Sequence, residues 1–306
     1  MLMTDLLARL PEGLRRRLPA LPPPTPRNLW LLLAAAIATQ NLGVFQSSQS
    51  EHTTVYALLV WGGALICMED QLEELDPDPG ALGMLLGSLL LLAVMARTAA
   101  VVSADGALFL LAPLAGLGLA LLARPLSQLG RLRDSLLCLL LIPAYGVLVK
   151  LIPERPMSVL TARMSSFWLS ILGFDNVVRD RTVMMPTGGV EVLPACNGVD
   201  TIAQVICVSI IFLLAFPIRS RLSRIVLLAS APCIGLACNT IRIAVLALCV
   251  SAGQGKGTPL FRFFHDDLGS LLFSGVAVFV FGSLYMRLLE RELPPLPGHG
   301  NTEVEE

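Results

Sequence analysis

The sequence has little charge for its length, and most of its positive charge is arginine. Of 306 residues, 15% are charged and 55% are hydrophobic, whereas a soluble domain is about one quarter charged. Only two lysines are present, Lys150 and Lys256, and no basic run has the pattern of a nucleic-acid-binding patch. With a mean hydropathy of +0.72, the apolar residues cannot all be buried in one soluble core. The composition therefore predicts an integral membrane protein without a nucleic-acid partner.

Several common catalytic and metal-binding motifs are missing from the sequence. It contains neither the Gly-x-Ser-x-Gly element of serine hydrolases nor the His-Glu-x-x-His element of zinc proteases. Paired aspartates in two apolar runs are missing too. None of the seven cysteines has a paired metal-ligand spacing, and six of them fit small buried apolar residues. We therefore expect no metal and no other cofactor. The cysteines are Cys67, Cys138, Cys196, Cys207, Cys233, Cys238 and Cys249.

Long apolar runs recur along most of the chain and predict an all-α membrane protein with about eight transmembrane helices. The first run begins at Leu29, after an Arg- and Pro-rich segment, and no small-residue cleavage site follows it. We interpret it as an uncleaved first span rather than a secretory signal. The second run is short for a span. The seven further runs cover about 54–68, 80–96, 105–123, 135–152, 197–217, 224–250 and 268–286.

The distribution of arginine predicts the orientation of these spans. Five arginines precede residue 28, and eight more lie in alternate loops on the same predicted side. The short loops of the other side hold only Arg97, Lys256 and Arg262, although the long loop adds four arginines. Lys and Arg are enriched on the cytoplasmic side of membrane proteins. We expect both termini in the cytoplasm and the chain in the plasma membrane as a multi-pass protein.

One long connection, 153–195, interrupts the series of spans on the predicted outer side. Its first part has apolar residues at helical spacing and predicts an amphipathic helix on the membrane surface. Its second part predicts a short β-hairpin, with Thr182–Met185 and Val190–Val192 flanking a Pro-Thr-Gly-Gly turn. The predicted divisions are a cytoplasmic segment 1–27, five spans in 28–152, the outer loop 153–195, three spans in 196–288 and a cytoplasmic tail 289–306.

Three polar segments stand at the predicted outer ends of the last three spans. They contain Cys196, Arg242 and His265. Each residue lies 18 to 22 positions from the cytoplasmic end of its span, which is about 27–33 Å at the α-helical rise. These lengths approximate one hydrocarbon thickness of ~30 Å. The spacing therefore predicts that the three side chains reach the same level of the membrane. Ionisable groups in spans indicate function by default.

A cysteine, a histidine and an arginine together suit acyl transfer. The cysteine attacks as a thiolate, which a neighbouring cation favours. Histidine carries protons near neutral pH, and arginine is a permanent donor to a developing oxyanion. Four neighbours have expected supporting roles. Asn197 and Asn239 fit caps or interhelical hydrogen bonds, and Gly198 lies beside Cys196 and Asn197. Asp200 fits an ion-pair or structural role, and an ion pair with Arg242 is one alternative to the catalytic role of that arginine.

Two other functions fit the same composition. A channel or transporter would also carry polar residues in its spans, and Gln40, Asn41 and Gln204 are compatible with one. Such a protein should have polar groups at the membrane midplane, whereas the charged groups here gather at one rim. An intramembrane protease of another mechanism is the second alternative. The missing serine, zinc and paired-aspartate elements argue against it.

At these polar segments the chain resembles the exosortase/archaeosortase family of membrane transpeptidases. The resemblance rests on Ala195-Cys196-Asn197-Gly198, on Asn239-Thr240-Ile241-Arg242, and on His265 before Leu268-Gly269. The hairpin from Pro186 to Val192 is similar as well, and the resemblance covers about residues 155–286. The Cys-Asn-Gly element and the later Phe-His-Asp look closest to the cyanobacterial branch. Asn197 stands where many members of the family have serine.

The resemblance implies a specific activity. Such enzymes recognise a C-terminal sorting signal on exported proteins, made of a Pro-Glu-Pro-like (PEP-CTERM) motif, a hydrophobic helix and a basic tail. They cleave near the motif at the outer face and transfer the product to a surface acceptor. By this resemblance Cys196 is the nucleophile, His265 the acid/base and Arg242 the oxyanion stabiliser. The expected partners are the signal-bearing proteins, membrane lipid and a surface acceptor.

Overall fold

A computed structural model describes residues 25–48, 51–73, 75, 77–100 and 106–292 of the chain. The described residues are mainly α-helical, with one small antiparallel sheet. Nearly all of the predicted segment 1–27, and the predicted tail beyond residue 292, lie outside these residues.

Every predicted apolar run is mostly helical, with the run 135–152 divided between two helices, so the fold class is confirmed. Among the described residues, five helical stretches are long and apolar enough to cross a membrane. Three shorter apolar helices, Thr53–Ile66, Leu108–Ala123 and Val199–Ala215, account for the remaining runs. The fold is therefore that of a mostly α-helical membrane protein, and a total of eight spans stays a prediction. The five long stretches are Pro26–Ser47, Gly80–Ala99, Leu126–Leu151, Arg221–Ser251 and Asp267–Glu290.

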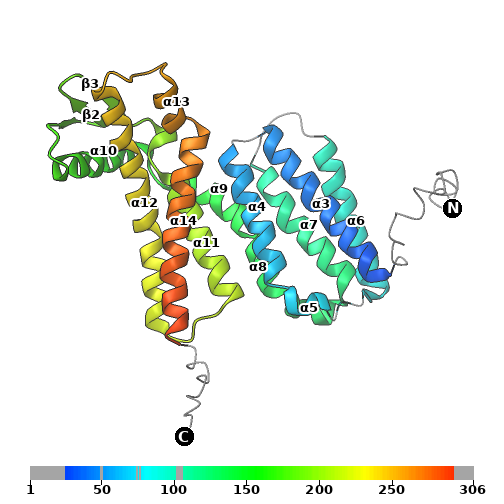
Figure 1. Ribbon diagram of the computed structural model, residues 1–306. Helices are drawn as coiled ribbons and strands as arrows, with labels where there is room; N and C mark the ends of the chain where they lie inside the picture. Colours follow the sequence, from blue (N-terminus) through cyan, green and yellow to red (C-terminus); the bar gives the residue numbers. More distant parts are fainter. Residues whose placement is uncertain (1–24, 49–50, 74, 76, 101–105, 293–306) are drawn as a thin grey trace, which may run out of the picture.

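The first half of the chain forms a bundle of antiparallel helices (Figure 1). Small residues let α6 and α7 approach closely, because a Cβ on Gly87 would lie 2.9 Å from the carbonyl oxygen of Gly118. The indole of Trp61 donates to Asn41 Oδ1 at 3.1 Å, which joins α4 to α3. The elements are α3 (Pro26–Ser48), α4 (Glu51–Ile66), α5 (Glu69–Glu73), α6 (Gly80–Ala99), α7 (Leu108–Ala123), the 3₁₀ segment η1 (Leu126–Leu132), α8 (Arg133–Leu139) and α9 (Leu141–Leu151).

The second half is built around the long helix α12 (Arg221–Ser251), which packs against α11 (Val199–Ala215) and α14 (Asp267–Glu290). Gly235 makes the α11 contact possible, since a Cβ there would lie 2.8 Å from the Cα of Ile202. Thr201 and Ser274 share a hydrogen bond of 3.2 Å between α11 and α14. The start of α3 and the end of α14 lie at the same end of the molecule, opposite α13 (Pro259–His265) and the sheet (Figure 1).

The predicted loop helix is present as α10 (Glu154–Ile171), which runs across α12 rather than along it (Figure 1). Its packed face is small and polar, with Ser158, Thr161 and Ser165 buried. Leu169 is buried against the protein, whereas Phe167 and Ile171 on the other face are 54% and 61% exposed. This exposed apolar stripe fits the predicted position on a membrane surface.

The predicted hairpin is confirmed, but the sheet has one strand more. The strand β2 (Thr182–Met185) pairs antiparallel with β3 (Gly188–Glu191), so the turn is shorter than predicted. A third strand, β1 (Val177–Arg179), pairs with the other edge of β2. Its three residues are too few to show an alternating pattern. The sheet is joined to α12 by Thr187, whose hydroxyl donates to the Ser251 carbonyl at 3.0 Å.

Candidate active site

Cys196 ends a short 3₁₀ turn, η2 (Pro194–Cys196), directly before α11. Its side chain is buried, with 8% exposed. Two neighbouring elements hold the backbone here. The Asn239 amide donates to the Cys196 carbonyl at 3.1 Å, and the Thr161 hydroxyl donates to the Asn197 carbonyl at 2.7 Å. The thiol is therefore fixed at the junction of η2, α10 and α12.

Gly198 and Asn197 shape the start of α11. Gly198 has φ +88°, a conformation that residues with a side chain rarely adopt. A Cβ at this position would also lie 2.6 Å from Asn239 Nδ2. Asn197 Oδ1 accepts from the Val199 N–H at 3.0 Å, which satisfies a free amide at the helix start. Asn197 thus bonds the backbone at the start of α11, and Asn239 ties α12 to the turn that carries Cys196.

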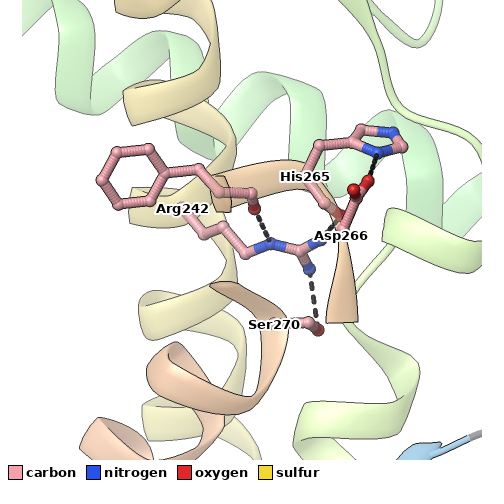
Figure 2. A network of polar contacts seen from close by, with 5 residues as sticks. Arg242, His265, Asp266 and Ser270 are labelled. Atoms are coloured by element: carbon pink, nitrogen blue, oxygen red, sulfur yellow. Dashed lines mark hydrogen bonds and ion pairs between the residues drawn. The ribbon is translucent and has the colours of Figure 1, made fainter. Parts of the chain in front are cut away.

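Arg242 is buried, with only 3% exposed, and its guanidinium joins α12 to the corner between α13 and α14. Nε donates to the Phe264 carbonyl at 3.0 Å, and Nη2 donates to the His265 carbonyl at 2.9 Å (Figure 2). Nη1 donates to the Ser270 hydroxyl at 3.0 Å. The two carbonyls belong to the last turn of α13, where no intrahelical donor reaches them. The guanidinium therefore holds the backbone of the histidine segment.

The same guanidinium also lies beside Cys196, close enough for an electrostatic interaction with its sulfur. Nη1 and Nη2 each carry a second hydrogen beyond those used by Ser270 and His265. One arginine can thus fix the histidine segment and still offer an N–H group toward the thiol. Cys196, Arg242 and the backbone of His265 form one continuous cluster.

The imidazole of His265 lies at the rim of this cluster, and the side chain is 42% exposed. Its Nδ1 is 3.1 Å from Asp266 Oδ1 (Figure 2), and its ring stacks on Phe261 with centroids 5.3 Å apart. Within the described part of the chain, no hydrogen bond joins the imidazole to the Cys196 sulfur. A substrate group between them, or a turn of the ring, is needed for proton transfer.

Asp200 does not pair with Arg242, so the expected ion pair between them is wrong. The Asp200 carboxylate accepts from the Tyr145 hydroxyl at 2.6 Å, and Arg242 is used by the α13 carbonyls and Ser270. The position of Asp200 in the first turn of α11 turns it toward α9 instead of α12. It keeps the predicted structural role with a different partner.

The sequence alone did not identify Thr161, Ser270, Asp266 or Tyr145 as neighbours of these residues. Asp266 and Ser270 carried a signal, because both lie within five residues of His265 in a polar helix entry. Thr161 and Tyr145 gave no such signal, since each lies on a helix far from the cluster in sequence. Among the described residues, no group of three His, Cys, Asp or Glu side chains is placed to hold a metal ion.

Together the fold and this cluster define a polytopic membrane protein with a buried cysteine and arginine at one end of its helices. The model of the transmembrane exosortase family matches residues 46–282, which is most of the chain. The protein belongs to this family of membrane cysteine transpeptidases. No curated protein and no solved structure matches the chain.

Proposed function

We propose that this protein cleaves C-terminal sorting signals of exported proteins through a Cys196 thioester and transfers the products to a surface acceptor. The observation that carries the proposal is the position of Cys196 within electrostatic range of the buried Arg242, which also holds the His265 backbone. A thiolate is the nucleophilic form of cysteine, and a neighbouring guanidinium stabilises its negative charge.

The reaction assigns one role to each member of the cluster. The Cys196 sulfur bonds to the carbonyl carbon of the scissile amide, and the carbonyl oxygen becomes an oxyanion near Arg242. When this tetrahedral intermediate collapses, the C–N bond breaks and the leaving amine takes a proton from His265. The acceptor nucleophile then loses its proton to His265 and displaces the Cys196 thiolate from the thioester. If water attacks instead of an acceptor, the same steps give hydrolysis.

The substrate proposed here is a protein that ends in a PEP-CTERM-like motif, a hydrophobic helix and a basic tail. The exposed apolar residues of α10 and of the long helices suit a substrate that arrives within the bilayer. A motif directly outside its hydrophobic helix would then lie at the same end of the molecule as Cys196.

We place this end at the outer face of the plasma membrane, with both termini in the cytoplasm. The arginine distribution supports this orientation. Single-cysteine labelling tests it with Ser48→Cys and Gly255→Cys, built in a chain whose native cysteines are replaced. We expect both to react with an impermeant maleimide in intact cells. Reaction only after permeabilisation overturns the orientation.

The catalytic proposal is tested by co-expressing the protein with a reporter that carries such a C-terminal signal. We expect Cys196→Ala to abolish processing and Cys233→Ala, on the exposed face of α12, to retain it. A hydroxylamine-sensitive adduct between reporter and enzyme should be lost in Cys196→Ala. Normal processing by this variant rules out nucleophilic catalysis by Cys196.

A further inference from the structure

Ser270 carries a buried hydroxyl that the reaction proposed above does not use. It lies in the first turn of α14 and is 8% exposed. Gly269 allows this turn to lie against α13, because a Cβ at Gly269 would lie 2.6 Å from the Cα of Phe264. In this close packing the Ser270 hydroxyl accepts a hydrogen bond from Arg242 Nη1 at 3.0 Å (Figure 2). Ser270 is thus a direct neighbour of the predicted oxyanion stabiliser.

The bond to Ser270 differs in its geometry from the other two hydrogen bonds of Arg242. Nε and Nη2 lie on one edge of the planar guanidinium and donate to the consecutive carbonyls of Phe264 and His265 at 3.0 and 2.9 Å. A planar group that is held at two points of one edge can still tilt about that edge. Nη1 lies off the edge, so its bond to Ser270 is the one that fixes the tilt.

The tilt of the guanidinium decides where its unused N–H groups point. After these three bonds Arg242 keeps one N–H on Nη1 and one on Nη2. Cys196 and Asp267 are the charged or ionisable groups within electrostatic range of the guanidinium. Hydrogen bonds weaken steeply as the donor angle becomes unfavourable, and an oxyanion donor is most effective when it is fixed before the reaction. The orientation of this plane therefore affects how well Arg242 can stabilise a thiolate or an oxyanion.

Ser274 provides a comparison within the same helix. It lies about one turn beyond Ser270 on the buried face of α14 and is 2% exposed. Its hydroxyl shares a hydrogen bond of 3.2 Å with Thr201, which joins α14 to α11. Ser274 therefore has the structural role expected of a buried serine between helices, whereas the partner of Ser270 is the charged group beside Cys196.

We propose that Ser270 is a positioning residue, which fixes the plane of the Arg242 guanidinium so that its unused N–H groups are directed at the Cys196 sulfur and at the oxyanion. Ser270 forms no bond to the substrate and transfers no proton in the reaction. The effect on the oxyanion rests on the function proposed above. The effect on the Cys196 thiol does not, because it is present without a substrate.

The first test measures how fast iodoacetamide alkylates Cys196 in the full-length protein in detergent, by mass spectrometry of the peptide that carries this cysteine. The thiolate is the reactive form, and we expect Ser270→Ala to slow its alkylation about three- to tenfold. The matched control Ser274→Ala should change the rate less than about 1.5-fold, because its hydroxyl bonds to Thr201. In an Arg242→Lys background Ser270→Ala should have no further effect, since lysine has no Nη1 to be held. A purely structural role of Ser270 predicts the same slowing in both backgrounds.

The second test compares kcat and KM for a reporter that carries the C-terminal sorting signal. We expect Ser270→Ala to lower kcat about five- to twentyfold and to leave KM within about twofold, because the directed N–H groups act on the transition state. Ser274→Ala should keep both values near those of the wild type.

The two tests separate this proposal from the function proposed above. A wild-type protein that does not process the reporter contradicts that function and leaves the alkylation result to decide the role of Ser270. Unchanged alkylation in Ser270→Ala, or equal slowing in the Arg242→Lys background, overturns the proposal. So does a change in KM alone, or a loss of folded protein in Ser270→Ala that Ser274→Ala does not show in thermal unfolding.

Discussion

Arg242 Nη2 donates to the backbone carbonyl of His265 at 2.9 Å, so the predicted oxyanion stabiliser is physically joined to the predicted acid/base. A second hydrogen bond holds the same segment, because Nε of this guanidinium donates to the Phe264 carbonyl at 3.0 Å. A change at Arg242 is therefore expected to affect both the charge beside Cys196 and the position of the histidine segment. The predictions below separate these effects.

Arg242→Lys is expected to insert in the membrane and to process substrate about 10²–10³-fold more slowly, the usual effect of losing one oxyanion donor. Lysine keeps the charge, but it lacks the planar fork that reaches Phe264, His265 and Ser270 together. The matched control is Arg262→Lys, an exposed arginine of α13, which should process normally. Reporter processing and size-exclusion profiles are compared. Near-normal processing by Arg242→Lys removes Arg242 from the catalytic cluster.

Asp266→Asn is expected to lower processing only about two- to fivefold, since exposed ion pairs contribute about 0.2–1 kcal/mol. Asp266 orients the imidazole through its 3.1 Å contact, but both side chains are largely exposed, at 61% and 42%. Asp175→Asn, at an exposed position before β1, serves as the control. Reporter processing at one pH is compared for both variants. A loss as complete as that of Cys196→Ala would show that Asp266 takes part in the chemistry.

Gly198→Ala should lower stability by about 1–3 kcal/mol and disturb the position of Cys196. The cause is twofold, because φ is +88° and a Cβ would press on the Asn239 amide that holds the Cys196 carbonyl. Gly275→Ala, on α14 with nothing within 4 Å of a Cβ, should be neutral or stabilising. Thermal unfolding in detergent and reporter processing measure the two effects. Wild-type values for both in Gly198→Ala would contradict the geometry.

Asp200→Asn and Tyr145→Phe are expected to destabilise the protein by similar amounts, about 1.5–3 kcal/mol for a hydrogen bond to a charged group. Their effects should not add in the double variant, because the two side chains share one hydrogen bond of 2.6 Å. Asp200→Asn and Arg242→Ala should add fully, since these residues bind different partners. If the effect of Asp200→Asn instead adds to that of Tyr145→Phe and is non-additive with that of Arg242→Ala, Asp200 pairs with Arg242 and the structure is contradicted.

The sequence by itself determined the helical membrane fold, a helix in the first part of the connection 153–195, the hairpin and the prediction that Cys196, Arg242 and His265 lie at one level. These features depend on hydropathy and on the fixed rise of a helix, which are local properties of the chain. Hydropathy and helical rise can both be taken from one stretch of sequence. The three polar segments could therefore be predicted at the same end of the helices without knowledge of the packing.

Only the tertiary structure decided the partner of each polar group. Whether Asp200 meets Arg242 or Tyr145 depends on how α11 is rotated against α9 and α12, and spacing along the chain does not set that rotation. The same holds for the Arg242 contacts across the α13–α14 corner. The sequence predicts which groups a helix carries, while packing between helices fixes which of those groups touch.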